Sequence, residues 1–189
     1  MARSWLWLAT RMAAWPGGTA RAASYLATRS ADPAVMRAMT AVTLPDGRVW
    51  FATADSSGTV QLWDGAQGMT TGKAISSEAG PVWSMTALTI PEPMTVLFTG
   101  EDDGRIHRWD VETGEPVGEP FGDHAGAVRA MAAGPPIDGM PTLVTGGDDG
   151  TVRRWDAEAG QRLGPPLRSG SGAVWGSLSL GCRPARRSW

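Results

Sequence analysis

Few residues of this chain could do acid–base chemistry. The 189 residues include only two histidines, His107 and His124. His124 could join Thr145 and Asp149 in a Thr/His/Asp hydrolase triad, in which an imidazole takes the proton of the attacking hydroxyl and a carboxylate orients the imidazole. Whether these side chains meet depends on the elements that carry them.

Metal and phosphate sites have little support. Neither histidine has a second histidine at ligand spacing, and the single cysteine, Cys182, cannot form a zinc cage of several thiolates. The acidic runs 101–103 and 148–149 could suggest calcium, but they have turn composition and no EF-hand-like ligand series follows. Glycines 146, 147 and 150 lack the lysine of a phosphate-binding loop. We expect no catalytic residue, no metal and no cofactor.

The composition describes a folded chain close to electroneutrality. Apolar residues make up 42% and charged residues 19%, and the formal charge is −2. This charge provides no field that would attract nucleic acid or anionic lipid. No apolar run reaches the roughly 18–20 residues that span a bilayer. One thiol makes a reducing compartment the default. We therefore expect a cytoplasmic protein that binds neither nucleic acid nor membrane.

The first 30 residues differ from the rest. They contain four arginines and no acidic residue, as in organellar transit peptides, whereas their apolar stretch at residues 5–9 is short for a secretory signal. A targeting segment therefore remains one interpretation. The other, which we favour for residues 1–30, is a poorly structured leader or a decayed repeat.

One segment recurs at a constant spacing of 46 residues. WD dipeptides begin at Trp63, Trp109 and Trp155. Other columns keep the same spacing: Gly58, Gly104 and Gly150; Thr53, Thr99 and Thr145; Gly80, Gly126 and Gly172; Val82, Val128 and Val174. A repeat of this length is typical of solenoids and propellers.

Each unit predicts four short strands. In the second unit they fall at residues 82–90, 94–99 and 105–109, followed by a segment that runs toward residue 121; in the third they fall at 127–133, 142–145, 151–155 and 161–167. The runs are apolar or rich in β-formers and are separated by turn residues. A loop at residues 134–139 is expected between the first two strands of the third unit. No segment has a sustained helical period.

Residues 145–156, TGGDDGTVRRWD, follow an entry at His124 to Val128, and together they resemble the WD-repeat (WD40) β-propeller family. The resemblance covers residues 34–175. It implies an all-β fold, an incomplete propeller of about three four-stranded antiparallel blades in an open arc. The expected repeats are 31–76, 77–122 and 123–168. Residues 169–189 would hold the start of a fourth repeat and an irregular basic tail.

Propellers have roughly 4–8 blades, so this number of units predicts a partial or truncated member of the family. Lys73 is the sole lysine, and Ala, Gly and Pro are abundant, which favours a GC-rich bacterial source. Open blade edges would invite self-association. Assembly of several chains into one ring is a further alternative.

In the family, a hydrogen-bonded tetrad braces each blade, and the resemblance assigns it here to His124, Thr145, Asp149 and Trp155. This structural role is preferred to the hydrolase triad. Partial tetrads follow: Thr99, Asp103 and Trp109, with Glu78 in the histidine position; and Thr53 and Trp63, with Asp32 and Ser57 in the histidine and aspartate positions. We expect the first blade to be the least stable.

Arg37, Trp83, Arg129 and Trp175 form another column of this spacing. The resemblance places it at the start of each first strand, at a rim of the central channel. Arg and Trp are enriched at binding hot spots, so an acidic or aromatic peptide is a candidate partner. The alternative is packing between neighbouring blades.

The resemblance implies a non-catalytic protein–protein interaction scaffold. One alternative is a non-functional fragment of a larger propeller. Another is a regulatory sensor module of a signalling ATPase or kinase. An enzyme built on a propeller frame would need a rim cluster of acids or histidines, which the sequence does not offer.

Overall fold

The computed structural model describes residues 35–77, 79–90, 94–170 and 172–176, and these contain eleven strands and no helix. The leader expected at residues 1–30 lies outside this part of the chain. The strands are β1 (Met36–Thr43), β2 (Val49–Asp55), β3 (Thr59–Asp64), β4 (Thr70–Ser76), β5 (Val82–Ile90), β6 (Met94–Glu101), β7 (Ile106–Asp110), β8 (Val128–Ile137), β9 (Met140–Gly147), β10 (Thr151–Asp156) and β11 (Leu167–Arg168).

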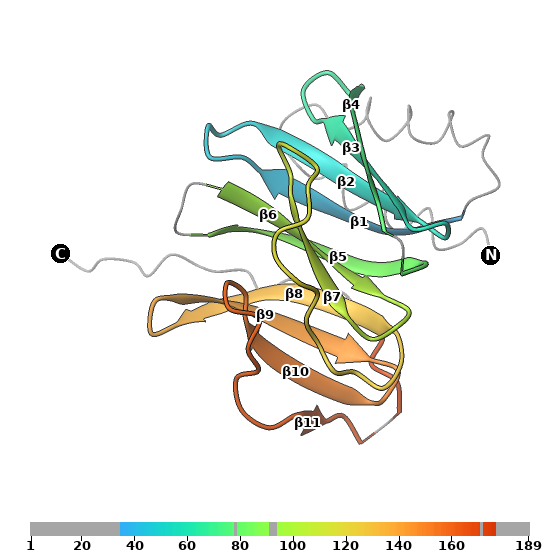
Figure 1. Cartoon of the computed structure of the whole chain (residues 1–189), viewed down its shortest axis with the longest axis vertical. Coiled ribbons are helices and arrows are strands. Elements are labelled where there is room, and N and C mark those ends of the chain that lie inside the picture. The colour runs from blue at the N-terminus through green and yellow to red at the C-terminus, as the bar shows by residue number, and fades with distance from the viewer. Residues whose placement is uncertain (1–34, 78, 91–93, 171, 177–189) are drawn as a thin grey trace.

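The strands form three antiparallel sheets, which we call the first (β1–β4), second (β5–β7) and third (β8–β11) blades. Within each blade, strands that are consecutive in the chain pair with each other. The blades stack face to face in chain order along the long axis of the molecule (Figure 1). This arrangement confirms the expected all-β, unclosed array of antiparallel propeller blades.

The fourth segment is short or irregular in the second and third blades, whereas β4 of the first blade pairs with β3 over several residues. In the second blade it forms no strand and meets β7 only through isolated bridges, Ile106 to Phe121 and Trp109 to Pro116. In the third blade β11 has two residues. Pro116 and Pro120 lack an amide hydrogen, and prolines interrupt a β-ladder for that reason. The second blade therefore has three strands rather than the four expected.

The prediction of a loop at residues 134–139 is wrong. β8 continues to Ile137, and only Asp138 and Gly139 make the turn, with φ of 51° and 81°. Positive φ at both central residues is the geometry of a two-residue hairpin turn. The strand tolerates Pro135 and Pro136 because β8 is an edge strand and its pairing shifts between Gly134 and Ile137.

The hydrophobic core lies between the blades. One buried cluster joins Ala52, Val60 and Leu62 of the first blade to Leu97 and Trp109 of the second. A second cluster joins residues of the second blade to the third: Val96, Phe98 and Ile106 with Val128, Met131, Leu143, Trp155 and Ala157. Burial of these apolar faces against one another is the main force that holds the stack together.

A small residue on the middle strand lets each blade approach the next. A Cβ atom on Gly100 would lie 2.8 Å from the Val128 side chain, and one on Gly146 would lie 2.6 Å from that of Val174. The Val174 amide also donates to the Gly147 carbonyl at 3.0 Å. Val174 thus meets the third blade as Val128 meets the second. Residues 172–176 form no strand, and the rest of the expected fourth unit lies outside the described residues.

We expect Gly100→Ala to lower the free energy of unfolding by about 2 kcal/mol, because the added methyl overpacks the blade interface. Urea unfolding followed by circular dichroism measures the change. Gly176→Ala is the matched control, since a Cβ there meets nothing within 4 Å. Equal stability of the Gly100 variant and the parent chain would show that the interface can relax.

Candidate functional site

The third blade brings His124, Thr145, Asp149 and Trp155 together. The Trp155 indole donates to Thr145 Oγ1 at 2.8 Å, and His124 Nε2 lies 2.8 Å from the same oxygen. Since that oxygen accepts from the indole, its own hydrogen is free to go to Nε2. His124 Nδ1 then donates to Asp149 Oδ1 at 3.1 Å. The His124 side chain has no exposed surface, and Thr145 is 1% exposed. This burial favours the bracing role that the resemblance implies over a hydrolase triad.

Asp149 anchors the network through several donors. Thr151 donates to Oδ1 from its hydroxyl at 2.7 Å and from its amide at 3.0 Å, the Ala125 amide donates at 3.1 Å, and Arg153 donates at 3.0 Å. Burial alone would raise the pKa of Asp149, but the hydrogen bonds from Thr151, His124 and Ala125 together lower the pKa to about 2. The carboxylate is therefore ionised at neutral pH.

The second blade completes its network in another way. Trp109 donates to Thr99 Oγ1 at 3.0 Å, and the Thr99 hydroxyl donates to Glu101 Oε1 at 3.1 Å. Asp103, expected in this partial tetrad, is exposed and accepts the Arg105 amide at 2.9 Å. In the third blade His124 joins the corresponding Asp149 to Thr145, whereas the second unit has no histidine in that position, and Asp103 lies apart from the network. Glu78, which takes the histidine position in the sequence, lies outside the described residues.

The network of the first blade joins its indole to a threonine and a backbone carbonyl. Trp63 donates to Thr53 Oγ1 at 2.8 Å, and among the described residues the Thr53 hydroxyl donates to the Gln61 carbonyl at 3.5 Å. Ser57 bonds within its own turn, to Asp55 at 2.5 Å. Asp32 lies outside the described residues. Trp63 is half-buried, whereas the corresponding indoles of the other blades are 8% and 3% exposed. The low stability expected of this blade remains a prediction.

Glu101 is the buried group that sequence reasoning missed. It has no exposed surface, its Oε2 accepts the Ser77 hydroxyl at 2.5 Å, and His107 Nε2 lies 3.6 Å away. Burial raises the pKa of Glu101, while Ser77, His107 and Thr99 oppose that rise. In an acidic run the residue looked like part of a turn.

The repeat itself contains a signal for Glu101. Gly147 takes its position in the third blade, where a Cβ would lie 2.5 Å from His124 Nδ1. The space beside the threonine therefore takes an imidazole from the linker or a carboxylate from the strand, but not both. The aligned repeats show this exchange at one position. The residue there is Gly147 in the unit that has the histidine and Glu101 in the unit that lacks it.

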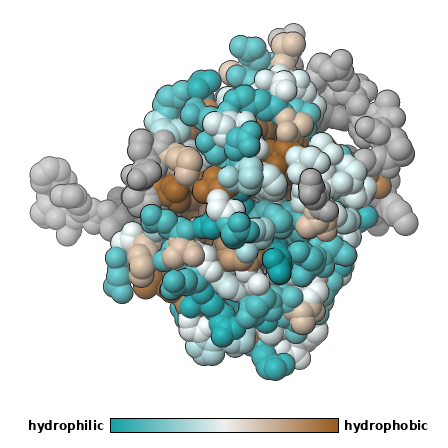
Figure 2. All heavy atoms as spheres, in the orientation of Figure 1, coloured by the Kyte–Doolittle hydropathy of each residue, from teal (hydrophilic) through white to brown (hydrophobic). Residues whose placement is uncertain are grey.

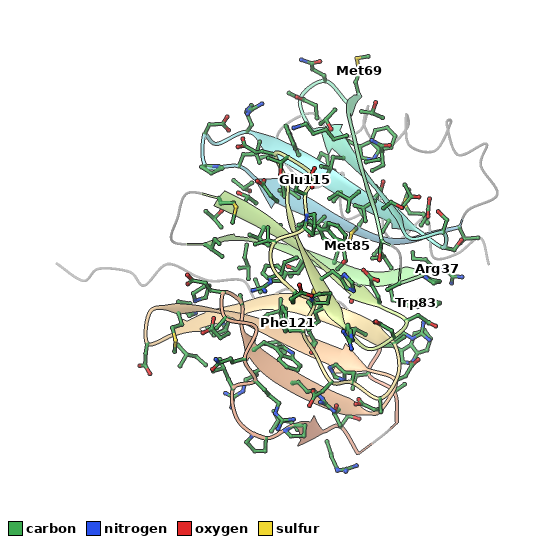
Figure 3. All side chains as sticks on the ribbon, viewed as in Figure 1. Arg37, Met69, Trp83, Met85, Glu115 and Phe121 are labelled. Carbon is green, nitrogen blue, oxygen red and sulfur yellow. The ribbon has the colours of Figure 1, made fainter. Side chains whose placement is uncertain are left out.

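The column Arg37, Trp83, Arg129 and Trp175 is a cation–π stack, which we call the Arg–Trp ladder. Arg37 Cζ lies 4.4 Å from the Trp83 ring centroid, and Arg129 Cζ lies 3.7 Å from Trp83 and 4.9 Å from Trp175. Figure 3 shows Arg37 beside Trp83 at one end of their strands. Each contact joins neighbouring repeat units, so the stack reinforces blade packing.

The inner rungs of the ladder are already paired. Arg129 donates two hydrogen bonds to Asp148, at 2.9 and 2.7 Å, and its side chain is 14% exposed. These bonds hold the pKa of Arg129 above its usual range and that of Asp148 below. The Trp83 indole donates to Asp102 at 3.0 Å. Arg37 and Trp175 at the two ends remain exposed, Trp175 by 69%.

Comparison with known families finds a match for the segment that holds His124, Thr145, Asp149 and Trp155. Residues 114–156 match the family model described as WD domain, G-beta repeat. This segment is similar to a WD40 repeat. That repeat includes His124, Thr145, Asp149 and Trp155. No curated protein matches the chain by sequence.

Solved structures extend the likeness beyond this WD40 repeat. The WD40 repeats of RRP9 superpose with a TM-score of 0.61 at 18% identity, covering 76% of this chain and 41% of that one. U3-55K gives 0.61 at 18%, covering 76% and 42%. The computationally designed Ika4 protein gives 0.60 at 19%, covering 80% and 82%. These matches establish the fold alone. The chain spans about two fifths of the length of the RRP9 and U3-55K chains.

Neither metal ligands nor membrane-spanning helices stand out in the described part of the chain. It contains no group of three or more His, Cys, Asp or Glu side chains placed to hold a metal. None of its elements is a helix long and apolar enough to cross a membrane. On the face drawn in Figure 2, hydrophilic residues predominate and apolar ones reach the surface in small patches.

We expect Asp149→Asn to lower the free energy of unfolding by about 2 kcal/mol at pH 7. The folded pKa of about 2 lies below the ordinary 3.8, so the carboxylate stabilises the fold above pH 4, and this contribution disappears as the pH falls toward 2. Urea unfolding at several pH values measures it. Asp138→Asn in the exposed β8–β9 turn is the control. An equal effect of both substitutions across that range would argue against the network.

We expect Glu101→Gln to be tolerated best at high pH. Because burial raises the pKa of Glu101, the folded chain holds that proton more tightly than the unfolded chain, and stability falls as the pH rises through the raised pKa. The difference in unfolding free energy between the variant and the parent chain should therefore shift in favour of the variant as the pH rises from 4 to 8. Glu115→Gln, at an exposed position, should show no such trend. A growing deficit of the Glu101 variant toward pH 8 would contradict the assignment.

Proposed function

We propose that this chain is a non-catalytic scaffold for protein–protein interaction. WD40 repeats generally mediate such interactions. The observation that carries the proposal is the Arg–Trp ladder, because it sets two exposed hot-spot residue types at the ends of a rigid stack. The only His–Asp–hydroxyl constellation among the described residues is buried, which favours a structural role for it. The lone thiol, Cys182, supports a reducing compartment such as the cytoplasm.

The proposed partner is a peptide segment with acidic and aromatic side chains. Arg37 is exposed and takes part in no ion pair among the described residues, so its guanidinium is available to a carboxylate. The exposed Trp175 ring offers an apolar face to an aromatic side chain. Arg129 contributes by holding the two tryptophans in place, since Asp148 already neutralises its charge.

Peptides in which Asp or Glu alternates with Phe or Tyr test this proposal, with Lys/Ser peptides of equal length as composition controls. Fluorescence anisotropy should show binding of the acidic-aromatic peptides to the full chain. Arg37→Ala and Trp175→Ala should each weaken it about tenfold, the loss expected for a hot-spot residue. Arg168→Ala, an exposed arginine on β11, should bind like the parent chain. Binding that neither ladder variant weakens would overturn the proposal, as would absence of binding.

A further inference from the structure

The turn after the second strand supplies an acid to the Arg–Trp ladder in two of the three blades. The turn residues are spaced by 46, like the ladder itself, and they are Ser56, Asp102 and Asp148. Asp148 accepts two hydrogen bonds from Arg129, at 2.9 and 2.7 Å, and Asp102 accepts one from the Trp83 indole at 3.0 Å. The first unit has a serine where the other two units have this acid.

The backbone around Ser56 matches the backbone around Asp148. The Ser56 amide donates to the Val35 carbonyl at 2.9 Å, and the Asp148 amide donates to the Ala127 carbonyl at 3.0 Å. Val35 and Ala127 are equivalent positions, since each lies two residues before the ladder arginine of its own blade. The two turns therefore meet their first strands in the same way.

Arg37 and Arg129 also share an irregularity in their strands. In β1 the pairing with β2 shifts between the residues on either side of Arg37, and in β8 the pairing with β9 shifts between those on either side of Arg129. Each arginine is thus the extra residue of a bulge, which sets the direction of its side chain. With turn and bulge in common, a carboxylate placed at position 56 as Asp148 is placed in the third blade would face Arg37.

The serine leaves that place open to a group from outside. Ser56 Oγ accepts the Val35 amide at 3.1 Å, so the hydroxyl still has its own hydrogen to donate. Ser56 is half-buried and Arg37 is exposed, so solvent reaches both side chains. Arg37 takes part in no ion pair within the described part of the chain.

The contact with Trp83 prepares the Arg37 guanidinium for a carboxylate. Arg37 Cζ lies over the indole at 4.4 Å from the ring centroid, and the N–H groups that do not face the ring remain free to donate in pairs. Arg129 shows the complete arrangement, because it lies 3.7 Å from the same indole and donates two hydrogen bonds to Asp148 at the same time. Arg37 has the indole without the acid.

We propose that Arg37 and Ser56 form the carboxylate site of the ladder, in which an Asp or Glu side chain of the bound peptide takes the place that Asp148 has beside Arg129. Arg37 donates two hydrogen bonds to this carboxylate, and the Ser56 hydroxyl donates a third. Ser56 thus determines specificity, because an acid at its position would fill the site from within. This inference rests on the peptide-binding function proposed above and fixes where the acidic side chain of the peptide lies.

Ser56→Asp tests the site by supplying the acid internally. Fluorescence anisotropy with the acidic-aromatic peptides should show binding to the full chain about ten times weaker than to the parent chain, as for Arg37→Ala. Arg37→Ala added to Ser56→Asp should cause no further loss, since both changes remove the same interaction. The Tm of Ser56→Asp should not fall, because the third unit carries Asp148 on the same backbone.

Ser57→Asp is the matched control, with the same change of charge one residue along the turn. The second unit carries acids at the positions of Asp55 and Ser57, namely Glu101 and Asp103, so the turn accommodates the pair. This variant should bind the peptides like the parent chain. Peptides with Asn and Gln in place of Asp and Glu should bind the parent chain as weakly as the acidic peptides bind Ser56→Asp.

The outcomes separate this inference from the function on which it rests. If the acidic-aromatic peptides do not bind the parent chain, the proposed function fails and the carboxylate site fails with it. If Arg37→Ala weakens binding and Ser56→Asp does not, the function stands and the assignment of the site is overturned. Equal losses in Ser56→Asp and Ser57→Asp would also overturn it, since the effect would then be one of general charge, and so would a lowered Tm of Ser56→Asp.

Discussion

One hydrogen bond recurs in every blade, from the indole of the third strand to a threonine hydroxyl of the second. Its length is 2.8, 3.0 and 2.8 Å in the three blades. A buried indole N–H needs an acceptor, and once the threonine oxygen accepts it, the hydroxyl hydrogen must find a partner of its own. The three blades meet that need with a carbonyl, a carboxylate and an imidazole. Much of the difference in polar chemistry among the blades follows from this choice.

The stacking of the blades depends on side chains that the repeat keeps small or apolar. Gly100 and Gly146 admit a valine from the following unit, and the apolar faces meet around them. The inner arginine of the Arg–Trp ladder, Arg129, adds a charged group to this packing without adding net charge, because Asp148 neutralises it. The inner rungs of the ladder pack blades together, and its ends remain available at the surface.

The periodic part of the fold could be predicted because strand positions follow from apolar runs between turn residues. The expected strand at residues 82–90 coincides with β5. The hairpin at residues 134–139 could not be placed, since two prolines predict a loop unless the edge position and the shifted pairing of β8 are known. Such features depend on the partner strand and are not encoded locally.

The residues of the candidate site also fall into those that the sequence could predict and those that it could not. The sequence located His124, Thr145, Asp149 and Trp155 because all four family positions carry the expected residue types. It missed Glu101 because an acid within residues 101–103 has the composition of an exposed turn, and only the fold shows that its side chain points inward. It also placed Asp103 in a network that it does not join, because the second unit lacks the histidine that links Asp149 to Thr145 in the third.

The exclusion between Glu101 and an imidazole has a consequence for how such a repeat can diverge after duplication. A unit with a large side chain at the position of Gly147 has no room for the ring of His124. Gain of the histidine must therefore follow loss of that side chain, and the reverse path must remove the ring first. Substitutions at the two sites must therefore occur in a fixed order. An intermediate that carried both side chains would pack badly, and this barrier can keep neighbouring repeats of one gene in different states, one with the histidine and one with the carboxylate.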